Sequence, residues 1–383
     1  MWKMRIAFIV HDYHRHGGHA RYVAELASRF KKDHEVHVFA SVWEEPDPDG
    51  ITFHYVPAWR WKALTSVLTF ILPATWMIGN KFDVVHAQGL CGFRHSVSTA
   101  HFIQSKWVKK LRSQGKSLGF STWIWQWIVG PLENFALGPF CSKRVIAISQ
   151  AVQRDLSSEC RISYNIDLIY HGTDLNKFQP GNVDLYRAEI RENLGIRENL
   201  FCAIFVGNLQ KGAATAIRAL VPAKSICLMI VSGSDPTAEK ALAVELGVEN
   251  RLIWVPLSKN IERYFASADC FVFPTLYEPF GMVISEAMAS GLPVITNREA
   301  GAAELIEHGV SGWLTEKPWD ADQIAEGMNA LANDPLLRKR MGEAARKAIE
   351  PFTWDRCATE TMAVYDQVVS GKTAPTRFFE GHP

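Results

Sequence analysis

The sequence predicts an α/β protein built from two doubly wound parallel sheets that follow one another along the chain. Short apolar runs rich in β-branched residues alternate with amphipathic stretches over most of the 383 residues. Continuous apolar runs bounded by Gly, Pro or polar residues are typical of strands that helices cover on both faces. The alternation happens twice, and a chain of this length holds about two domains. We therefore expect two domains of similar size.

Each predicted element rests on one of these patterns. Apolar runs predict buried strands at residues 4–10, 36–40, 83–87, 144–149, 201–207, 226–233, 270–274 and 293–296. Amphipathic spacing predicts helices between them, at residues 20–31, 213–220, 237–246, 282–290 and 321–333. The polar stretch 176–193, which contains Pro180 and Gly181, is interpreted as the linker between the two series. Ligands of such open sheets bind at the carboxyl ends of the strands.

Composition and charge exclude several classes of protein. Lys and Arg total 41 and Asp and Glu total 40, a net charge of +1, whereas nucleic-acid binders normally carry a clear basic excess. The seven cysteines are scattered singly, which argues against a disulfide framework or a zinc ribbon and favours a reducing, cytoplasmic setting. The N-terminal apolar run lacks the cleavage site of a signal peptide. The apolar stretch 64–79 is shorter than the roughly 20 residues that span a bilayer, so we expect no transmembrane span.

The strongest candidate site is the segment 278–287, EPFGMVISEA, which follows a predicted strand and begins a helix. Pro279 suits the first turn of a helix, and Gly281 lets a ligand approach the backbone closely. The free N–H groups of Gly281, Met282 and Val283 would then face a ligand, with the positive end of the helix dipole behind them. Such an arrangement is suited to phosphate.

Two carboxylates flank this predicted phosphate site, Glu278 before it and Glu286 within the helix. A carboxylate only accepts hydrogen bonds, so the pair suits the hydroxyls of a sugar on one side and of a ribose on the other. The alternative from spacing alone is that Glu278 helps to cap the helix and that Glu286 is an exposed helical residue.

Segment 278–287 resembles the E-x7-E signature of the retaining glycosyltransferases of the GT-B fold. The resemblance is to the family-4 (group 1) set, which includes lipopolysaccharide-core and mannosyl transferases. Further matches follow in the family's order and cover nearly the whole chain: Gly17-Gly18 and segments 34–38, 145–149, 170–174, 290–295 and 301–306. The resemblance implies two Rossmann-like doubly wound domains facing a cleft. It places an acceptor-side domain at residues 1–178, a nucleotide-sugar-binding domain at 179–351 and a final helix, 352–369, that packs back on the first domain.

The resemblance also implies roles for single residues. Glu286 would hold the ribose hydroxyls, and Glu278 with the backbone of residues 280–282 would contact the transferred sugar and the distal phosphate. Lys211 resembles the family's basic residue on the diphosphate, whose charge would stabilise the departing group. The alternative is a solvated loop lysine. The family usually carries an Arg and a longer loop after the preceding glycine, whereas this chain has Asn208. The implied donor-binding residues are Gly17, Gly18, Asn208, Lys211, Glu278, Phe280, Gly281, Met282, Val283 and Glu286, and the implied catalytic residues are His101, Glu278 and Lys211.

His101 ends the strand-like run 96–100 and matches a family histidine that faces the donor sugar. Its ring or backbone carbonyl would stabilise positive charge at the anomeric carbon or orient the acceptor, although a lone histidine is more often structural. Four further histidines surround the glycine pair, and such a cluster could bind a metal: His11, His14, His16 and His19. We interpret them as a polar loop, because the resemblance implies metal-independent transfer. The D-x-D-like run 47–49 is interpreted as a surface turn, because no suitable strand precedes it.

Tryptophan and basic residues are interleaved in the predicted first domain, a combination typical of proteins that contact lipid headgroups. The tryptophans are Trp59, Trp61, Trp76, Trp107, Trp123, Trp125 and Trp127, and the cations are Arg60, Lys62, Lys106, Lys109, Lys110, Arg112 and Lys116. The alternative is that the rings fill the core and the cations are solvated. The resembled family includes enzymes of the inner membrane, so we favour peripheral membrane association.

The resemblance therefore implies a retaining, metal-independent hexosyltransferase that needs no cofactor. The donor would be a nucleotide-diphosphate sugar, with a UDP-sugar favoured over GDP-mannose. The acceptor would be a glycan or lipid-linked saccharide in cell-envelope polysaccharide or lipopolysaccharide synthesis, in the cytoplasm or at the inner face of the membrane. Two alternatives remain open. One is a GT-B nucleotide-sugar epimerase, and the other is a catalytically degenerate nucleotide-sugar-binding partner protein, which Asn208 in place of the Arg would fit.

Overall fold

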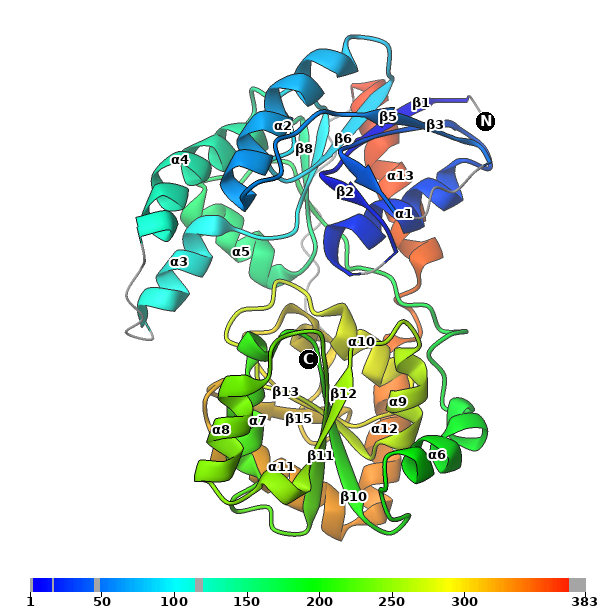
Figure 1. The fold of residues 1–383 in the computed structure, drawn as a ribbon. Helices are drawn as coiled ribbons and strands as arrows, with labels where there is room; N and C mark the ends of the chain where they lie inside the picture. The colour runs from blue at the N-terminus through cyan, green and yellow to red at the C-terminus, as the bar shows by residue number, and fades with distance from the viewer. Residues whose placement is uncertain (1–2, 16, 45–48, 114–119, 372–383) are drawn as a thin grey trace. The chain divides into compact units, whose positions relative to one another are not determined.

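The structure is a computed structural model that describes residues 3–15, 17–44, 49–113 and 120–371. The chain forms two compact units (Figure 1). The first unit comprises Met1–Gly172 and Trp354–Pro383, and the second comprises Thr173–Thr353.

The first unit is a parallel sheet with strand order β5-β3-β1-β6-β7-β8-β9. Its strands are β1 (Arg5–Ile9), β3 (Glu35–Ala40), β5 (Ile51–Tyr55), β6 (Val84–Gln88), β7 (Val97–Ala100), β8 (Arg144–Ala147) and β9 (Ile166–Leu168). Its helices are α1 (Gly18–Phe30), α2 (Ala63–Ile78), α3 (Gln104–Ser113), α4 (Phe120–Leu137), α5 (Gln150–Glu159) and α13 (Trp354–Ser370). A small separate sheet pairs β2 (Asp12–Tyr13) with β4 (Val42–Trp43). The central strand β1 is fully buried from Ile6 to Ile9, as a strand covered on both faces requires.

The second unit repeats the architecture with strand order β12-β11-β10-β13-β14-β15, and neighbouring strands in this order run parallel. Its strands are β10 (Phe201–Val206), β11 (Ile226–Ser232), β12 (Leu252–Pro256), β13 (Cys270–Phe273), β14 (Val294–Asn297) and β15 (Gly312–Thr315). Its α-helices are α6 (Asn182–Asn193), α7 (Ala213–Ala219), α8 (Thr237–Glu245), α9 (Ile261–Ser267), α10 (Met282–Ala289), α11 (Ala321–Asn333) and α12 (Pro335–Ile349). Short 3-10 turns occur at η1 (Leu209–Lys211), η2 (Glu249–Arg251) and η3 (Gly301–Leu305).

The structure confirms every predicted strand and helix, with ends shifted by a few residues. It also confirms the fold class, since both units are doubly wound parallel sheets. The predicted final helix is α13, which belongs to the first unit. At the start of the second unit, the Thr173 N–H donates to the carbonyl of Phe352 at 2.9 Å. The ring of Phe178 also packs on Phe265.

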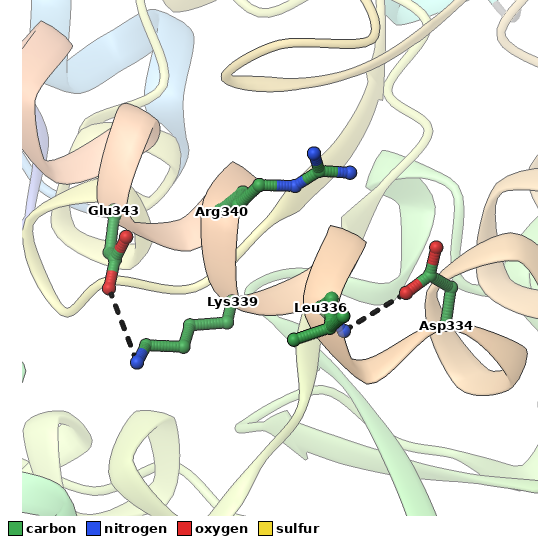
Figure 2. A pocket seen from close by; sticks show the side chains of 5 residues that line it. All are labelled: Asp334, Leu336, Lys339, Arg340 and Glu343. Carbon is green, nitrogen blue, oxygen red and sulfur yellow. Dashed lines mark hydrogen bonds and ion pairs between the residues drawn. The ribbon is translucent and has the colours of Figure 1, made fainter.

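A pocket of about 370 Å³ lies at the start of α12 in the second unit (Figure 2). It is lined by Asp334, Leu336, Lys339, Arg340 and Glu343. Asp334 is the N-cap of the helix and accepts hydrogen bonds from the N–H groups of Leu336 and Leu337. The pocket contains none of the predicted site residues.

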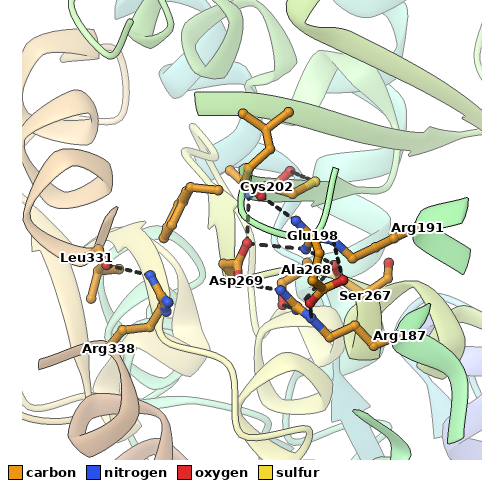
Figure 3. Close-up of polar contacts among 12 residues, drawn as sticks. Arg187, Arg191, Glu198, Cys202, Ser267, Ala268, Asp269, Leu331 and Arg338 are labelled. Atoms are coloured by element: carbon orange, nitrogen blue, oxygen red, sulfur yellow. Dashed lines mark hydrogen bonds and ion pairs between the residues drawn. The ribbon is translucent and has the colours of Figure 1, made fainter. Parts of the chain in front are cut away.

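The prediction that 176–193 is a linker is wrong, because most of this stretch is helix α6. Arg191 is 1% exposed and donates to the carbonyls of Ser267 and Leu200, the former at 2.8 Å (Figure 3). Asp269 accepts from Arg187 at 3.1 Å and from the backbone N–H of Cys202 at 2.8 Å. Arg187 and Arg191, which contributed to the polar character of the predicted linker, therefore anchor α6 near the start of strands β10 and β13.

Candidate active site

The loop after β10 holds Lys211 in a restrained turn. The Asn208 side chain accepts a hydrogen bond from the N–H of Gln210 at 2.9 Å and so caps the 3-10 turn η1. Gly212 has a φ of 106°, and a Cβ built there would lie 2.1 Å from the carbonyl oxygen of Pro274. Only glycine fits this approach to the end of β13. The backbone on both sides of Lys211 is therefore fixed, and Asn208 acts as a cap where the family usually has an Arg.

The loop from Glu278 to Gly281 is held by a second backbone contact. The N–H of Gly301 donates to the carbonyl of Glu278 at 2.8 Å, and the N–H of Ala302 donates to the carbonyl of Phe280 at 2.7 Å. A Cβ at Gly301 would lie 2.0 Å from the carbonyl oxygen of Pro279. The segment after β14 thus fixes the backbone that leads into α10.

Helix α10 begins at Met282 with its backbone donors available. Its N-cap is Gly281, which has a φ of 91° and no side chain to cap the first turn. The first turn carries no acidic residue. N–H groups at a helix N-terminus and the positive end of the helix dipole attract an anion. The phosphate site predicted at Gly281, Met282 and Val283 falls at this helix start and stays a prediction.

The structure brings Lys211 and Glu278 together. The Nζ of Lys211 lies 2.5 Å from the Oε2 of Glu278, and the two side chains are 44% and 13% exposed. They are placed by β10 and β13, which are neighbouring parallel strands whose carboxyl ends share one edge of the sheet. A basic and an acidic group next to an uncapped helix start can hold a phosphorylated sugar by charge and by hydroxyl hydrogen bonds.

Glu286 lies on α10, one turn after Met282, and is 7% exposed. The alternative interpretation of Glu286 as an exposed helical residue is therefore wrong. A carboxylate buried on this helix must be satisfied by hydrogen bonds or charge.

In the first unit His101 follows the carboxyl end of β7. Its Nε2 lies 2.8 Å from the Oε1 of Gln88, the last residue of β6. Its ring lies 5.0 Å from the ring of Tyr22, 5.4 Å from that of His171 and 5.9 Å from that of His19, measured between centroids. Burial, and then the charges of His171, His19 and His86, hold the pKa of His101 well below its usual range. His101 is therefore neutral near pH 7.

The glycine pair lies at the start of α1, with φ of 82° at Gly17 and 55° at Gly18. These left-handed conformations favour glycine. His19, the next residue, is the one whose ring faces His101. The structure thus places the predicted residues in two groups, with the glycine pair and His101 in the first unit and the remaining residues in the second.

Two family models match consecutive parts of the chain. The family described as Glycosyltransferase Family 4 matches residues 16–177, and the family described as Glycosyl transferases group 1 matches residues 186–348. The chain belongs to the group 1 glycosyltransferases.

Individual proteins resemble this glycosyltransferase over nearly its whole length. The alpha-maltose-1-phosphate synthase of Mycobacterium tuberculosis is 28% identical, over 95% of this chain and 100% of its own. The structure of WaaG, a glycosyltransferase involved in lipopolysaccharide biosynthesis, superposes with a TM-score of 0.77 at 20% identity, over 96% of this chain and 100% of its own. Anabaena HepE in complex with UDP and glucose superposes with a TM-score of 0.75 at 20% identity, over 95% and 99%. These likenesses identify the fold as GT-B.

The histidines near the glycine pair of the glycosyltransferase do not form a metal cluster in the described residues. His11 packs 4.3 Å from the ring of Phe70, and burial lowers its pKa to about 4. No group of three or more His, Cys, Asp or Glu side chains that could hold a metal ion occurs in the part of the chain that the structure describes. His16 and residues 47 and 48 lie outside the described residues. The exposed Asp49 accepts a hydrogen bond from Lys31 through its carbonyl, at 2.9 Å.

Sequence reasoning missed Gln88 and Tyr22, which both contact His101. Tyr22 is fully buried on α1 and reads in the sequence as one more apolar core position. Gln88 could have been predicted, because it is a polar residue directly after the predicted strand 83–87, at the edge where ligands of α/β sheets bind.

Proposed function

We propose that this glycosyltransferase transfers a sugar from a nucleotide-diphosphate sugar to a glycan or lipid-linked acceptor, with retention of anomeric configuration and without a metal ion. The observation that carries the proposal is the Lys211–Glu278 ion pair beside the uncapped start of α10. This arrangement offers one positive charge, a set of backbone donors and one carboxylate within a single domain.

The donor would replace the contact between the two side chains. Lys211 and the N–H groups at the start of α10 would bind the diphosphate, whose charge grows as the bond to the sugar breaks. Glu278, released from Lys211, would accept hydrogen bonds from hydroxyls of the transferred sugar. Glu286, buried one turn into the helix, would hold the ribose.

The retaining step needs no side-chain nucleophile in this proposal. The acceptor oxygen forms a bond to the anomeric carbon on the face from which the diphosphate departs. The bond between that carbon and the phosphate oxygen breaks, and the acceptor proton passes to the departing diphosphate. Lys211 and the helix start supply the charge stabilisation that a metal ion supplies elsewhere.

A UDP-sugar is the first candidate donor and GDP-mannose the second. HepE, which shares the fold, has been solved with UDP and glucose. The predicted setting is cell-envelope polysaccharide or lipopolysaccharide synthesis, in line with the role stated for WaaG.

We further propose that the enzyme binds the inner face of the membrane peripherally, through helices α2 and α4. Among the described residues, no helix is long and apolar enough to cross a bilayer. The two helices pack together through Ile71 of α2 and Val129 and Ala136 of α4, and Figure 1 shows them side by side. Helix α2 has no charged residue, and the one charged residue of α4, Glu133, is buried.

The outer surface of this helix pair exposes large apolar side chains: Leu72 and Trp76 from α2, and Trp127, Ile128 and Phe135 from α4. Trp76 is 83% exposed, which rules out a core role for this ring. Trp59 and Trp61 are also exposed just before α2, and the ammonium of Lys62 lies 4.7 Å from the Trp61 ring centroid. Exposed apolar patches beside aromatic and basic residues favour a lipid surface. The side chains of Trp123 and Trp125, and Lys116, lie outside the described residues.

A thermal-shift panel of UDP, GDP, ADP and their common sugars, each with and without EDTA, tests the donor proposal. A ligand at about 100 times its Kd should stabilise the protein by about 2.7 kcal/mol. We expect one nucleotide to give a shift that survives EDTA and that Glu286→Ala reduces. The exposed Glu326 of α11 provides the control Glu326→Ala, which should leave the shift unchanged. A shift abolished by EDTA, or no shift at all, would contradict the proposal. Donor turnover without acceptor would favour the epimerase.

A further inference from the structure

Gln88 occupies a fixed position at the carboxyl edge of the first sheet. It is the last residue of β6, is 5% exposed and lies in register with Thr99 on β7. Its carbonyl accepts a hydrogen bond from the Sγ of Cys91 at 3.0 Å, and the next N–H, that of Gly89, donates to the carbonyl of Thr99 at 2.9 Å. The backbone therefore holds the Gln88 side chain next to His101, which follows β7.

The contact between the two side chains sets the proton position on His101. The Oε1 of Gln88 lies 2.8 Å from the Nε2 of His101, and an amide oxygen can only accept a hydrogen bond. The Nε2 must therefore carry the proton. In the neutral ring Nδ1 is then the acceptor.

The other end of the Gln88 amide is its nitrogen, Nε2. This atom is buried and has no hydrogen-bond acceptor among the described residues. Buried donors without an acceptor are uncommon in native proteins, and such a group calls for an explanation. An acceptor that a bound substrate brings would provide one.

We propose that Gln88 positions His101 for glycosyl transfer by fixing its Nε2–H tautomer, and that it donates its own amide N–H to a hydroxyl oxygen of a bound sugar. The proposal rests on the proposed function, because it takes the carboxyl edge of this sheet as part of the transfer site. The sugar hydroxyl can belong to the donor or to the acceptor.

The surroundings of His101 make its tautomer a meaningful readout. The titratable groups around its ring include His19 and Tyr22 on α1, His86 on β6 and His171 after β9. His86 has its own partners, since its ring nitrogens lie 2.6 Å from the hydroxyl of Tyr365 and 2.7 Å from that of Thr99. Gln88 is thus the residue whose side chain directly contacts the Nε2 of His101.

The first test is long-range 1H–15N NMR of the full chain labelled at histidine. We expect His101 to give the Nε2–H pattern in the wild type and in Gln88→Glu, whose carboxylate still accepts, and a changed pattern in Gln88→Met. His95 is an internal reference in the same unit, because its Nε2 lies 3.0 Å from the carbonyl oxygen of Ala136 and does not involve Gln88. An Nδ1–H pattern in the wild type, or an unchanged pattern in Gln88→Met with the His95 signals intact, would overturn the proposal.

The second test is steady-state transfer by the same variants. Gln88→Met should lower kcat/KM about tenfold, the usual effect of removing one hydrogen bond in a buried site. A rise in KM for the donor alone would place the hydroxyl on the donor, and a rise for the acceptor alone would place it on the acceptor. Gln88→Glu should move the acidic limb of the pH profile of kcat/KM to higher pH, because its carboxylate favours protonated His101. Unchanged kcat/KM in both variants would overturn the substrate contact. A wild type that transfers no sugar would instead refute the proposed function, and the NMR result would still decide the role of Gln88.

Discussion

The ammonium of Lys211 and the carboxylate of Glu278 form an ion pair at 2.5 Å, although 67 positions separate them in the sequence. Each residue follows a strand of the second sheet, and the two strands are neighbours. The loop of Lys211 is held by the cap from Asn208 and by the close approach of Gly212 to Pro274. The order of the strands therefore brings an ammonium and a carboxylate together, although their loops are far apart in the sequence.

The first prediction concerns the charges of this pair. Lys211→Met should lower kcat/KM for transfer by about a hundredfold, since it removes positive charge next to the departing diphosphate. Glu278→Gln should lower transfer while nucleotide binding is partly kept, because Lys211 remains. In a double-mutant cycle the two effects should not add. Calorimetry with the nucleotide and initial rates measure both quantities. The exposed Lys224 supplies the control Lys224→Met, and an equal loss in that variant would contradict the role of Lys211.

The second prediction concerns the backbone under Lys211. Gly212→Ala places a Cβ 2.1 Å from the carbonyl oxygen of Pro274 and forces alanine into a left-handed conformation. Strain of this kind costs about 1–3 kcal/mol before any clash is counted. We expect a lower melting temperature and weaker nucleotide binding. Gly181→Ala is the matched control, because its φ is −61° and no atom lies within 4 Å of the added Cβ. Equal melting temperatures for the two variants would contradict the argument.

The central strands could be predicted from the sequence, and the edge strands could not. Within the two large sheets, the strands missing from the sequence prediction are β5 and β9 at the two edges of the first sheet, and β12 and β15 at the edges of the second. Central strands are buried on both faces and appear as continuous apolar runs. Edge strands are partly exposed, as in Ile51–Tyr55, where the buried Ile51 is followed by an exposed Thr52. The mixed composition of the edge strands therefore resembles that of a loop.

Some features of the candidate site could also be predicted from the sequence, and others could not. The segment around Glu278 and Gly281 could be predicted, because a helix start after a buried strand is a local pattern. The contact between Lys211 and Glu278, and that between Gln88 and His101, depend on which strands are neighbours. Strand order does not follow from local patterns. Arg191 was misread for the same reason, since its partners Ser267 and Asp269 lie more than 70 positions away.

The third prediction concerns the membrane surface of α2 and α4. Wild-type protein should float with anionic vesicles at low salt, and part of the binding should survive high salt, because apolar insertion is not screened. Replacing both Leu72 and Trp76 by serine should reduce flotation at least about tenfold, since it removes apolar surface worth several kcal/mol on transfer. Trp319→Ser is the control in the second unit, where Trp319 is 57% exposed. No flotation of the wild type, or an equal loss in the Trp319 variant, would refute the proposed surface.

The last prediction follows from Glu133, the buried carboxyl of α4. Its Oε2 accepts a hydrogen bond from the N–H of Gln104 at the start of α3, at 3.0 Å, and burial raises its pKa to about 7. Between about pH 4.5 and 7 the folded protein retains this proton while the unfolded chain loses it. The folded state binds more protons in this window, so the contribution of Glu133 to stability falls as the pH rises through it and is constant above pH 7. A shift of this size corresponds to about 3 kcal/mol.

Glu133→Gln tests this linkage, because the amide oxygen can still accept from Gln104 but carries no charge. The variant should be more stable relative to the wild type at pH 8 than at pH 4.5, by about 3 kcal/mol. Urea unfolding followed by tryptophan fluorescence measures this difference, since most of the tryptophans lie in the first unit. Glu326→Gln on the exposed surface of α11 should show no such difference between the two pH values. A Glu133→Gln effect that is equal at both values would mean that the buried carboxyl ionises in the folded protein as readily as in the unfolded chain.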